Sequence, residues 1–133
     1  MLHGVKYAIA LLFAGLCVYA SLRDSPYLVE LPFMPKGVGR WLDVHENTRH
    51  LWGYAVLTLL TGWAFLGGRT PVAWRNLVLS LSGLAILLEA LQIFLPHRRA
   101  DVWDVVWSLL GAAFGGLLGA AFARMTGERE DIP

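Results

Sequence analysis

Four long apolar stretches dominate the pattern of hydrophobic and polar positions along the chain. They cover residues 5–22, 50–67, 76–95 and 102–123. Each has about 18 to 22 residues, close to the ~20 that a helix needs to cross ~30 Å of hydrocarbon. Backbone groups in lipid must pair within their own segment, so helix is the expected conformation. The pattern predicts an all-α bundle of four transmembrane helices, in one integral membrane domain over residues 1–133.

The first stretch also has an interpretation as a signal peptide. The small residues of VYAS would suit cleavage after Ala20, and Lys6 supplies a basic flank. That flank is thin, however, and the stretch is long enough to span a membrane. We therefore predict that it is retained as a helix.

The longest polar segment, residues 23–49, lies between the first two apolar stretches. Its first half contains three prolines, which favour an extended backbone. Its second half, RWLDVHEN, places Trp41 and Val44 among charged residues, as in a helix that lies in the membrane interface. We predict a long loop with a short interfacial helix.

Four crossings would place both termini and the 67–75 connection on one side of the membrane. The 23–49 segment and the 96–101 turn would lie on the other. Basic residues divide five against six between these sides, so they give no clear orientation. If Arg98 and Arg99 serve a site and are discounted, both termini are cytoplasmic. We predict a multi-pass protein of the cytoplasmic (inner) membrane.

Composition agrees with a membrane protein and excludes nucleic acid as a partner. The chain is 56% hydrophobic and 16% charged, with a net charge of +1 and no basic stripe. The single cysteine, Cys17, cannot form an intramolecular disulfide and is expected to pack as a small hydrophobic residue. The tryptophans near helix ends are expected in the interfacial belt, namely Trp52, Trp74, Trp103 and Trp107.

Polar positions within the later stretches fall on single helical faces. The second stretch carries them at intervals of four, four, four and three, which is one face of a helix: Glu46, His50, Tyr54, Thr58 and Thr61. The third carries Glu89 and Gln92, three residues apart. The fourth has Asp101, Asp104, Ser108, Gly111, Gly115 and Gly119 on one face. Its glycines let another backbone approach closely, so this whole face should point toward protein.

Glu89 is the polar residue whose placement costs most. It lies six residues before the end of its stretch, roughly 9 Å below the surface. An ionised carboxylate in mid-membrane costs about 2.5–3.5 kcal/mol. Glu89 must therefore face the bundle, be protonated or find a cation, and the available cations are Arg49, His50, Arg98 and Arg99. A buried pair that only fixes helix register is the structural alternative.

The motifs in these stretches resemble the VanZ-like family over residues 46–119. They read Glu46-x-x-x-His50-x-x-x-Tyr54, Glu89-x-x-Gln92, Pro96-x-Arg98-x-x-Asp101-x-x-Asp104 and Gly111-x-x-x-Gly115. The resemblance implies a small integral membrane protein associated with resistance to the glycopeptide teicoplanin or with envelope polysaccharide machinery. The chain has Glu46-Asn47 where the family usually has Asp-Lys, and Ser108 where it usually has Asn. These departures place in doubt a role for a lysine or an amide there.

Convergence of three helices would gather the polar residues into a ligand site. Arginine suits phosphate or carboxylate, the other polar groups suit sugar hydroxyls, and apolar walls suit an acyl or prenyl tail. The predicted set is Glu46, Arg49, His50, Tyr54, Glu89, Gln92, Arg98, Asp101 and Asp104. We predict that the protein binds, positions or helps transport an amphiphilic envelope component, such as a lipid-linked glycan, a phospholipid or a lipoglycopeptide. No cofactor is implied.

Two other functions remain open. A membrane-embedded hydrolase or transferase could use His50, Glu89 and Asp104 as catalytic groups on a lipid phosphate. In that case Arg98 would stabilise the oxyanion, and Glu89, Asp101 and Asp104 could hold a divalent metal. No serine or cysteine stands out as a nucleophile. The chain could instead be a structural subunit of an envelope polysaccharide assembly, with envelope-biogenesis proteins as partners.

Overall fold

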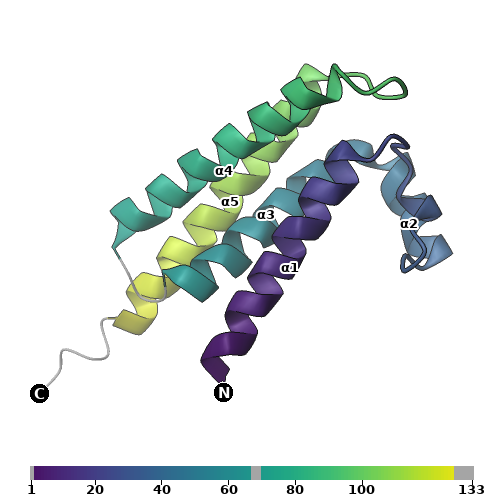
Figure 1. The fold of residues 1–133 in the computed structure, drawn as a ribbon. Helices are drawn as coiled ribbons and strands as arrows, with labels where there is room; N and C mark the ends of the chain where they lie inside the picture. Colours follow the sequence, from purple (N-terminus) through teal and green to yellow (C-terminus); the bar gives the residue numbers. More distant parts are fainter. Residues whose placement is uncertain (1, 67–69, 128–133) are drawn as a thin grey trace, which may run out of the picture.

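The computed structural model describes residues 2–66 and 70–127, in which helices are joined by loops and turns. The elements are α1 (Leu2–Leu22), the 3-10 helix η1 (Leu28–Glu30), α2 (Lys36–Val44), α3 (Glu46–Phe65), α4 (Pro71–Gln92) and α5 (Val102–Gly127) (Figure 1). These residues contain no strand, so the predicted all-α fold class is confirmed. Residues 67–69, in the predicted connection and at the end of the second apolar stretch, lie outside the described residues.

Three helices are long and apolar enough to cross a membrane. They are α1 over Gly4–Leu22, α4 over Pro71–Gln92 and α5 over Val102–Thr126, with mean hydropathies of 1.8, 1.5 and 1.8. Large apolar side chains such as Leu12, Leu79 and Leu117 are exposed along them, which suits contact with lipid. These helices indicate a membrane-embedded protein.

Helix α3 differs from the other three long helices. It has 20 residues, but its first turns carry Glu46, Arg49 and His50, and it does not reach the same hydropathy. It lies at the centre of the bundle, where it contacts α1, α4 and α5, most extensively α5. Polar groups in its middle meet protein; Thr58, for example, is fully buried and donates to the Tyr54 carbonyl oxygen at 2.8 Å.

The long helices run lengthwise beside one another. α1 begins and α5 ends at one end of the bundle, while α2 and the turn between α4 and α5 lie at the other end (Figure 1). The buried core forms where the long helices meet, around Tyr54, Leu57, Ala85 and Ala112. The polar ends of three helices and the loop after α1 thus share one end of the bundle.

Glycines bring the backbones of α3 and α5 into contact. A Cβ atom on Gly111 would lie 2.1 Å from the Leu51 carbonyl oxygen, and one on Gly115 would lie 2.4 Å from that of Ala55. No side chain fits in that space, so the two helices approach as closely as their backbones allow. Gly119, one turn further along, faces the ring of Trp74 instead.

Trp74 is buried, and its predicted place in the interfacial belt is wrong. Only 4% of it is exposed. Its indole fills a slot between Gly62 of α3 and Gly119 of α5, because a Cβ on either glycine would lie within 2.2 Å of the ring. Trp52 and Trp103, by contrast, are half-exposed or more. The slot exists because two glycines lie on different helices. The spacing of residues along a single helix cannot predict that glycines of two helices will face the same side chain.

A short helix does follow the proline-containing loop, as predicted, although it begins earlier than RWLDVHEN. Val38, Trp41 and Val44 of α2, spaced by three residues, are all exposed. The Asp43 carboxylate accepts the backbone N–H groups of Leu28 at 2.7 Å and Val29 at 3.0 Å. Asp43 therefore fixes η1 against α2 and holds the loop close to the bundle.

The backbone contact between α3 and α5 predicts a specific effect of adding one methyl group. Gly111→Ala should destabilise the protein by about 1–3 kcal/mol, because the methyl group forces the two helices apart. Gly83→Ala is the matched control, since a Cβ there meets nothing within 4 Å. It should be neutral or stabilising by up to about 1 kcal/mol, from helix propensity. Reversible unfolding in mixed micelles measures both; equal effects would contradict the contact.

Candidate functional site

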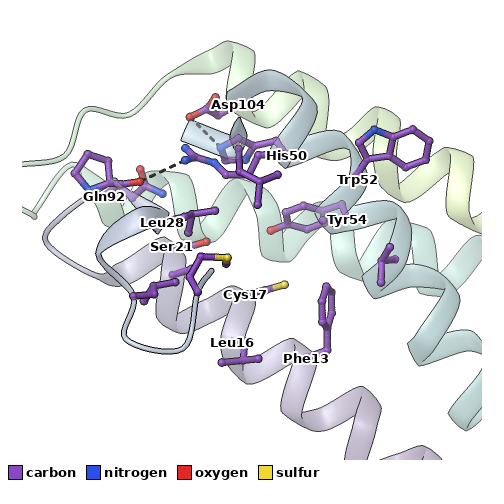
Figure 2. A pocket seen from close by; sticks show the side chains of 18 of the residues that line it. Phe13, Leu16, Cys17, Ser21, Leu28, His50, Trp52, Tyr54, Gln92 and Asp104 are labelled. Atoms are coloured by element: carbon purple, nitrogen blue, oxygen red, sulfur yellow. Dashed lines mark hydrogen bonds and ion pairs between the residues drawn. The ribbon is translucent and has the colours of Figure 1, made fainter. Parts of the chain in front are cut away.

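A pocket of about 390 Å³ lies at the end of the bundle that carries α2. Its walls come from α1, from the loop and η1, and from the first half of α3, with single residues of α2, α4, α5 and the α4–α5 turn. Figure 2 shows His50, Asp104 and Gln92 near one another on one side, and Phe13 and Leu16 on the other. The pocket is therefore amphipathic, with a polar end and an apolar end.

Several residues at the apolar end of the pocket are exposed. Leu16 of α1, Phe33 of the loop, and Trp52 and Val56 of α3 all line the pocket and are also exposed on the outer surface. Leu16 lies six residues before the end of α1, about 9 Å along the helix axis. This part of the pocket wall therefore lies along the side of α1, at a depth that α1 would place inside a membrane.

His50 joins α3 to α5 at the polar end. Its Nε2 lies 3.4 Å from Oδ2 of Asp104, and its Nδ1 lies 3.3 Å from Oγ of Ser108 (Figure 2). The Ser108 hydroxyl donates to the Asp104 carbonyl oxygen at 2.7 Å. Ser108 is also only 3% exposed and is not part of the pocket wall. The cluster can hold and transfer a proton through His50 and Asp104, but its one hydroxyl group, that of Ser108, is not presented to a ligand.

Two arginines contribute to the same end of the pocket. Arg49 donates through Nη1 to Oδ1 of Asp43 at 3.3 Å and to the Pro26 carbonyl oxygen at 3.4 Å. Arg98 donates through Nη2 to the carbonyl oxygens of Ala20 at 2.7 Å and Ser21 at 2.9 Å. These are carbonyls of the last turn of α1, which have no partner within the helix. Both arginines therefore fasten the end of α1 and its loop to the rest of the bundle.

Arg98 lacks a full set of partners. Its Nε is buried and has no hydrogen bond. Burial lowers the pKa of the guanidinium, and the positive charge of Arg49 lowers it further, while Glu89 and Asp104 act in the opposite direction. An arginine stays protonated even so. Its guanidinium therefore keeps a buried N–H donor without a partner.

Glu89 forms a hydrogen bond that stabilises the turn between α4 and α5. It is 8% exposed, and its Oε1 accepts the backbone N–H of Asp101 at 2.6 Å. The Asp101 carboxylate in turn accepts the N–H of Trp103 at 2.9 Å, at the start of α5. Within the described residues Glu89 forms no ion pair with an arginine or a histidine. Its cost of burial is thus offset by a charge-assisted hydrogen bond to the backbone.

The predicted ligand residues divide into two groups. Those that line the pocket are Arg49, His50, Tyr54, Gln92, Arg98 and Asp104. Those that do not are Glu46, which is exposed at the start of α3, and the Glu89–Asp101 pair. The divalent metal site hypothesised from Glu89, Asp101 and Asp104 is not formed. No group of three potential ligand side chains gathers anywhere in residues 2–66 and 70–127.

Sequence reasoning missed the contribution of α1 and the loop. Phe13, Cys17 and Ser21 lie on one face of α1 at intervals of four and line the pocket, as do apolar residues around η1 such as Leu28 and Leu31. On that face only Ser21 and the thiol of Cys17 can form hydrogen bonds, and they were the only indication in the sequence that α1 lines a pocket. Apolar wall residues are indistinguishable by type from residues that contact lipid.

Comparisons of the chain with models of protein families, with curated proteins and with solved structures find no match.

The Glu89–Asp101 hydrogen bond predicts a local effect of removing the carboxylate charge. Glu89→Gln should weaken the bond and cost about 1–2 kcal/mol, because hydrogen bonds to charged groups are stronger than neutral ones. Hydrogen exchange at the amides of residues 100–104 should accelerate, while exchange within α3 should not. Glu30→Gln, which alters an exposed pair with Arg23, is the control. Unchanged exchange at 100–104 would show that the bond does not hold this turn.

Proposed function

We propose that the protein binds an amphiphilic component of the cell envelope in this pocket, and so positions it or helps to transport it. The observation that carries the proposal is the amphipathic pocket itself. Its polar end gathers Arg49, His50 and Arg98, and its apolar end is lined by exposed residues of α1 and α3. A ligand with a polar head and an apolar tail can place its head inside while its tail leaves through the flank.

The size of the pocket supports a head group rather than a whole lipid. Its volume of about 390 Å³ lies at the lower end of the ~300–1,000 Å³ that is usual for small-molecule sites. A head group and the first carbons of a chain would fill it. The remaining tail would lie along exposed apolar residues of α1 and α3, such as Leu12 and Val56, in contact with lipid.

A fourth membrane crossing by α3 belongs to the same proposal. The helix has 20 residues, which gives about 30 Å of length. It packs against all three apolar helices and leaves residues such as Val56 and Trp63 exposed, so polar side chains on its packed side need not meet hydrocarbon. With four crossings, α1 begins and α5 ends on one side. This arrangement is consistent with cytoplasmic termini in the inner membrane and with a site on the opposite face.

Membership of the VanZ-like family is a further part of the proposal. Several of the residues that carry the resemblance line one pocket, although they come from three helices and a turn: His50, Tyr54, Gln92, Arg98 and Asp104. Their shared position supports a common role in binding a ligand. The resemblance favours a lipid-linked glycan, a phospholipid or a lipoglycopeptide as the ligand.

The pocket can be blocked from within by a single substitution. Gly53 lines it, and a Cβ there meets nothing within 4 Å, so Gly53→Leu should fold normally and fill the cavity. We expect amphiphile binding to fall by at least about tenfold, because the added side chain occupies the space of the head group. Native mass spectrometry of protein purified in mild detergent measures the lipid that stays bound.

Gly83→Leu on α4 is the matched control, because that glycine also faces open space but lies outside the pocket. It should retain wild-type occupancy. Equal lipid occupancy in Gly53→Leu and Gly83→Leu would refute binding in this pocket.

A further inference from the structure

We infer that the head of the bound amphiphile is a phosphate ester, and that Arg98 and Arg49 together hold it. This inference rests on the proposed function, because it specifies the head group of the same ligand. Its starting point is the incomplete pairing of Arg98.

Arg98 is a half-buried cation with only neutral partners in direct contact. Its Nη2 is used by two backbone carbonyl oxygens of α1, and its buried Nε has no partner. No carboxylate in the described part of the chain forms an ion pair with it. Buried charges in proteins are normally paired, because removing an ion from water costs several kcal/mol. An anionic ligand supplies the missing partner.

The pocket wall contains more positive than negative side chains. Among the lining residues two arginines face a single carboxylate, that of Asp104, which lies against His50. Arg49 also pairs with Asp43, a carboxylate that lies outside the pocket wall and accepts two backbone N–H groups of the loop. Glu89 is bonded to the Asp101 backbone and lies outside the pocket wall. An anion in the pocket would therefore meet two guanidinium groups and one carboxylate.

A phosphate fits two separate guanidinium groups better than a carboxylate does. Arg49 comes from α3 and Arg98 from the α4–α5 turn, so they approach from different elements. A tetrahedral phosphate offers oxygens in several directions and can accept from both, whereas a carboxylate offers two oxygens in one plane. The Gln92 amide, also in the wall, can serve a remaining phosphate oxygen or a neighbouring hydroxyl.

The apolar wall of the pocket favours a phosphate that is attached to a lipid over free phosphate. Apolar residues such as Leu28, Leu16 and Phe33 line the rest of the pocket, and Leu16 and Phe33 are also exposed. Free phosphate would leave this lining unused. A phosphate attached to a long hydrocarbon chain uses both ends, so the chemical class is a lipid phosphate, whether its chain is acyl or prenyl.

The test compares three probes on the full chain in uncharged detergent: farnesyl phosphate, farnesol and inorganic phosphate. Farnesyl phosphate should bind at least about tenfold more tightly than farnesol, and inorganic phosphate should bind more weakly than farnesyl phosphate. Arg98→Gln should weaken farnesyl phosphate binding by at least about tenfold and leave farnesol binding unchanged. Arg99→Gln, which alters an exposed neighbour outside the wall, should change neither.

The outcomes distinguish failure of the phosphate head group from failure of the amphiphile-binding function. Equal affinity for farnesol and farnesyl phosphate overturns the phosphate head group and leaves the amphiphile pocket intact. Binding of inorganic phosphate as tight as that of farnesyl phosphate overturns the lipid source. Equal losses in Arg98→Gln and Arg99→Gln overturn the assignment to Arg98. If neither lipid binds, the proposed function fails as well. Should Arg98→Gln not fold, the three probes on the wild-type chain still decide the inference.

Discussion

The close approach of α3 to α5 is the constraint on which the rest of the structure depends. Gly111 and Gly115 remove every side chain from the contact, so the α3 backbone lies directly on α5. That contact makes α3 the central helix and sets His50 level with Asp104 and Ser108. It also gives α3 a protein environment for a polar face that lipid would not tolerate. The polar end of the pocket is a consequence of this packing.

Hydrogen bonds from charged side chains hold α1 and the loop against the bundle, and these two segments complete the pocket wall. Arg98 bonds the last carbonyls of α1, Arg49 bonds the loop, and Asp43 bonds the start of η1. In each case a charged side chain forms hydrogen bonds with neutral backbone atoms, and these bonds hold the side chain in place. The arginines therefore combine two tasks, since they position a wall of the pocket and keep donor capacity and positive charge at its polar end.

The sequence allowed prediction of the helices and of the polar half of the site, for identifiable physical reasons. Long apolar runs predict helices in a membrane, and intervals of three and four placed His50, Asp104 and Gln92 on inward faces. It could not reveal that Glu89 bonds the Asp101 backbone instead of an arginine, because any nearby donor satisfies a carboxylate. Nor could it place Trp74, whose slot depends on glycines of two other helices, or the apolar wall from α1 and η1.

Crosslinking from inside the pocket tests the central claim most directly. A farnesyl phosphate analogue with a photoreactive group on the first carbons of its chain would be bound to the membrane-embedded protein and irradiated. Mass spectrometry would then locate the crosslinks. Binding in the pocket predicts crosslinks to residues 13–21 of α1 and residues 28–34 of the loop, removed by excess unlabelled lipid. Crosslinks confined to the exposed faces of α4 and α5, around Leu79 and Leu117, would contradict it.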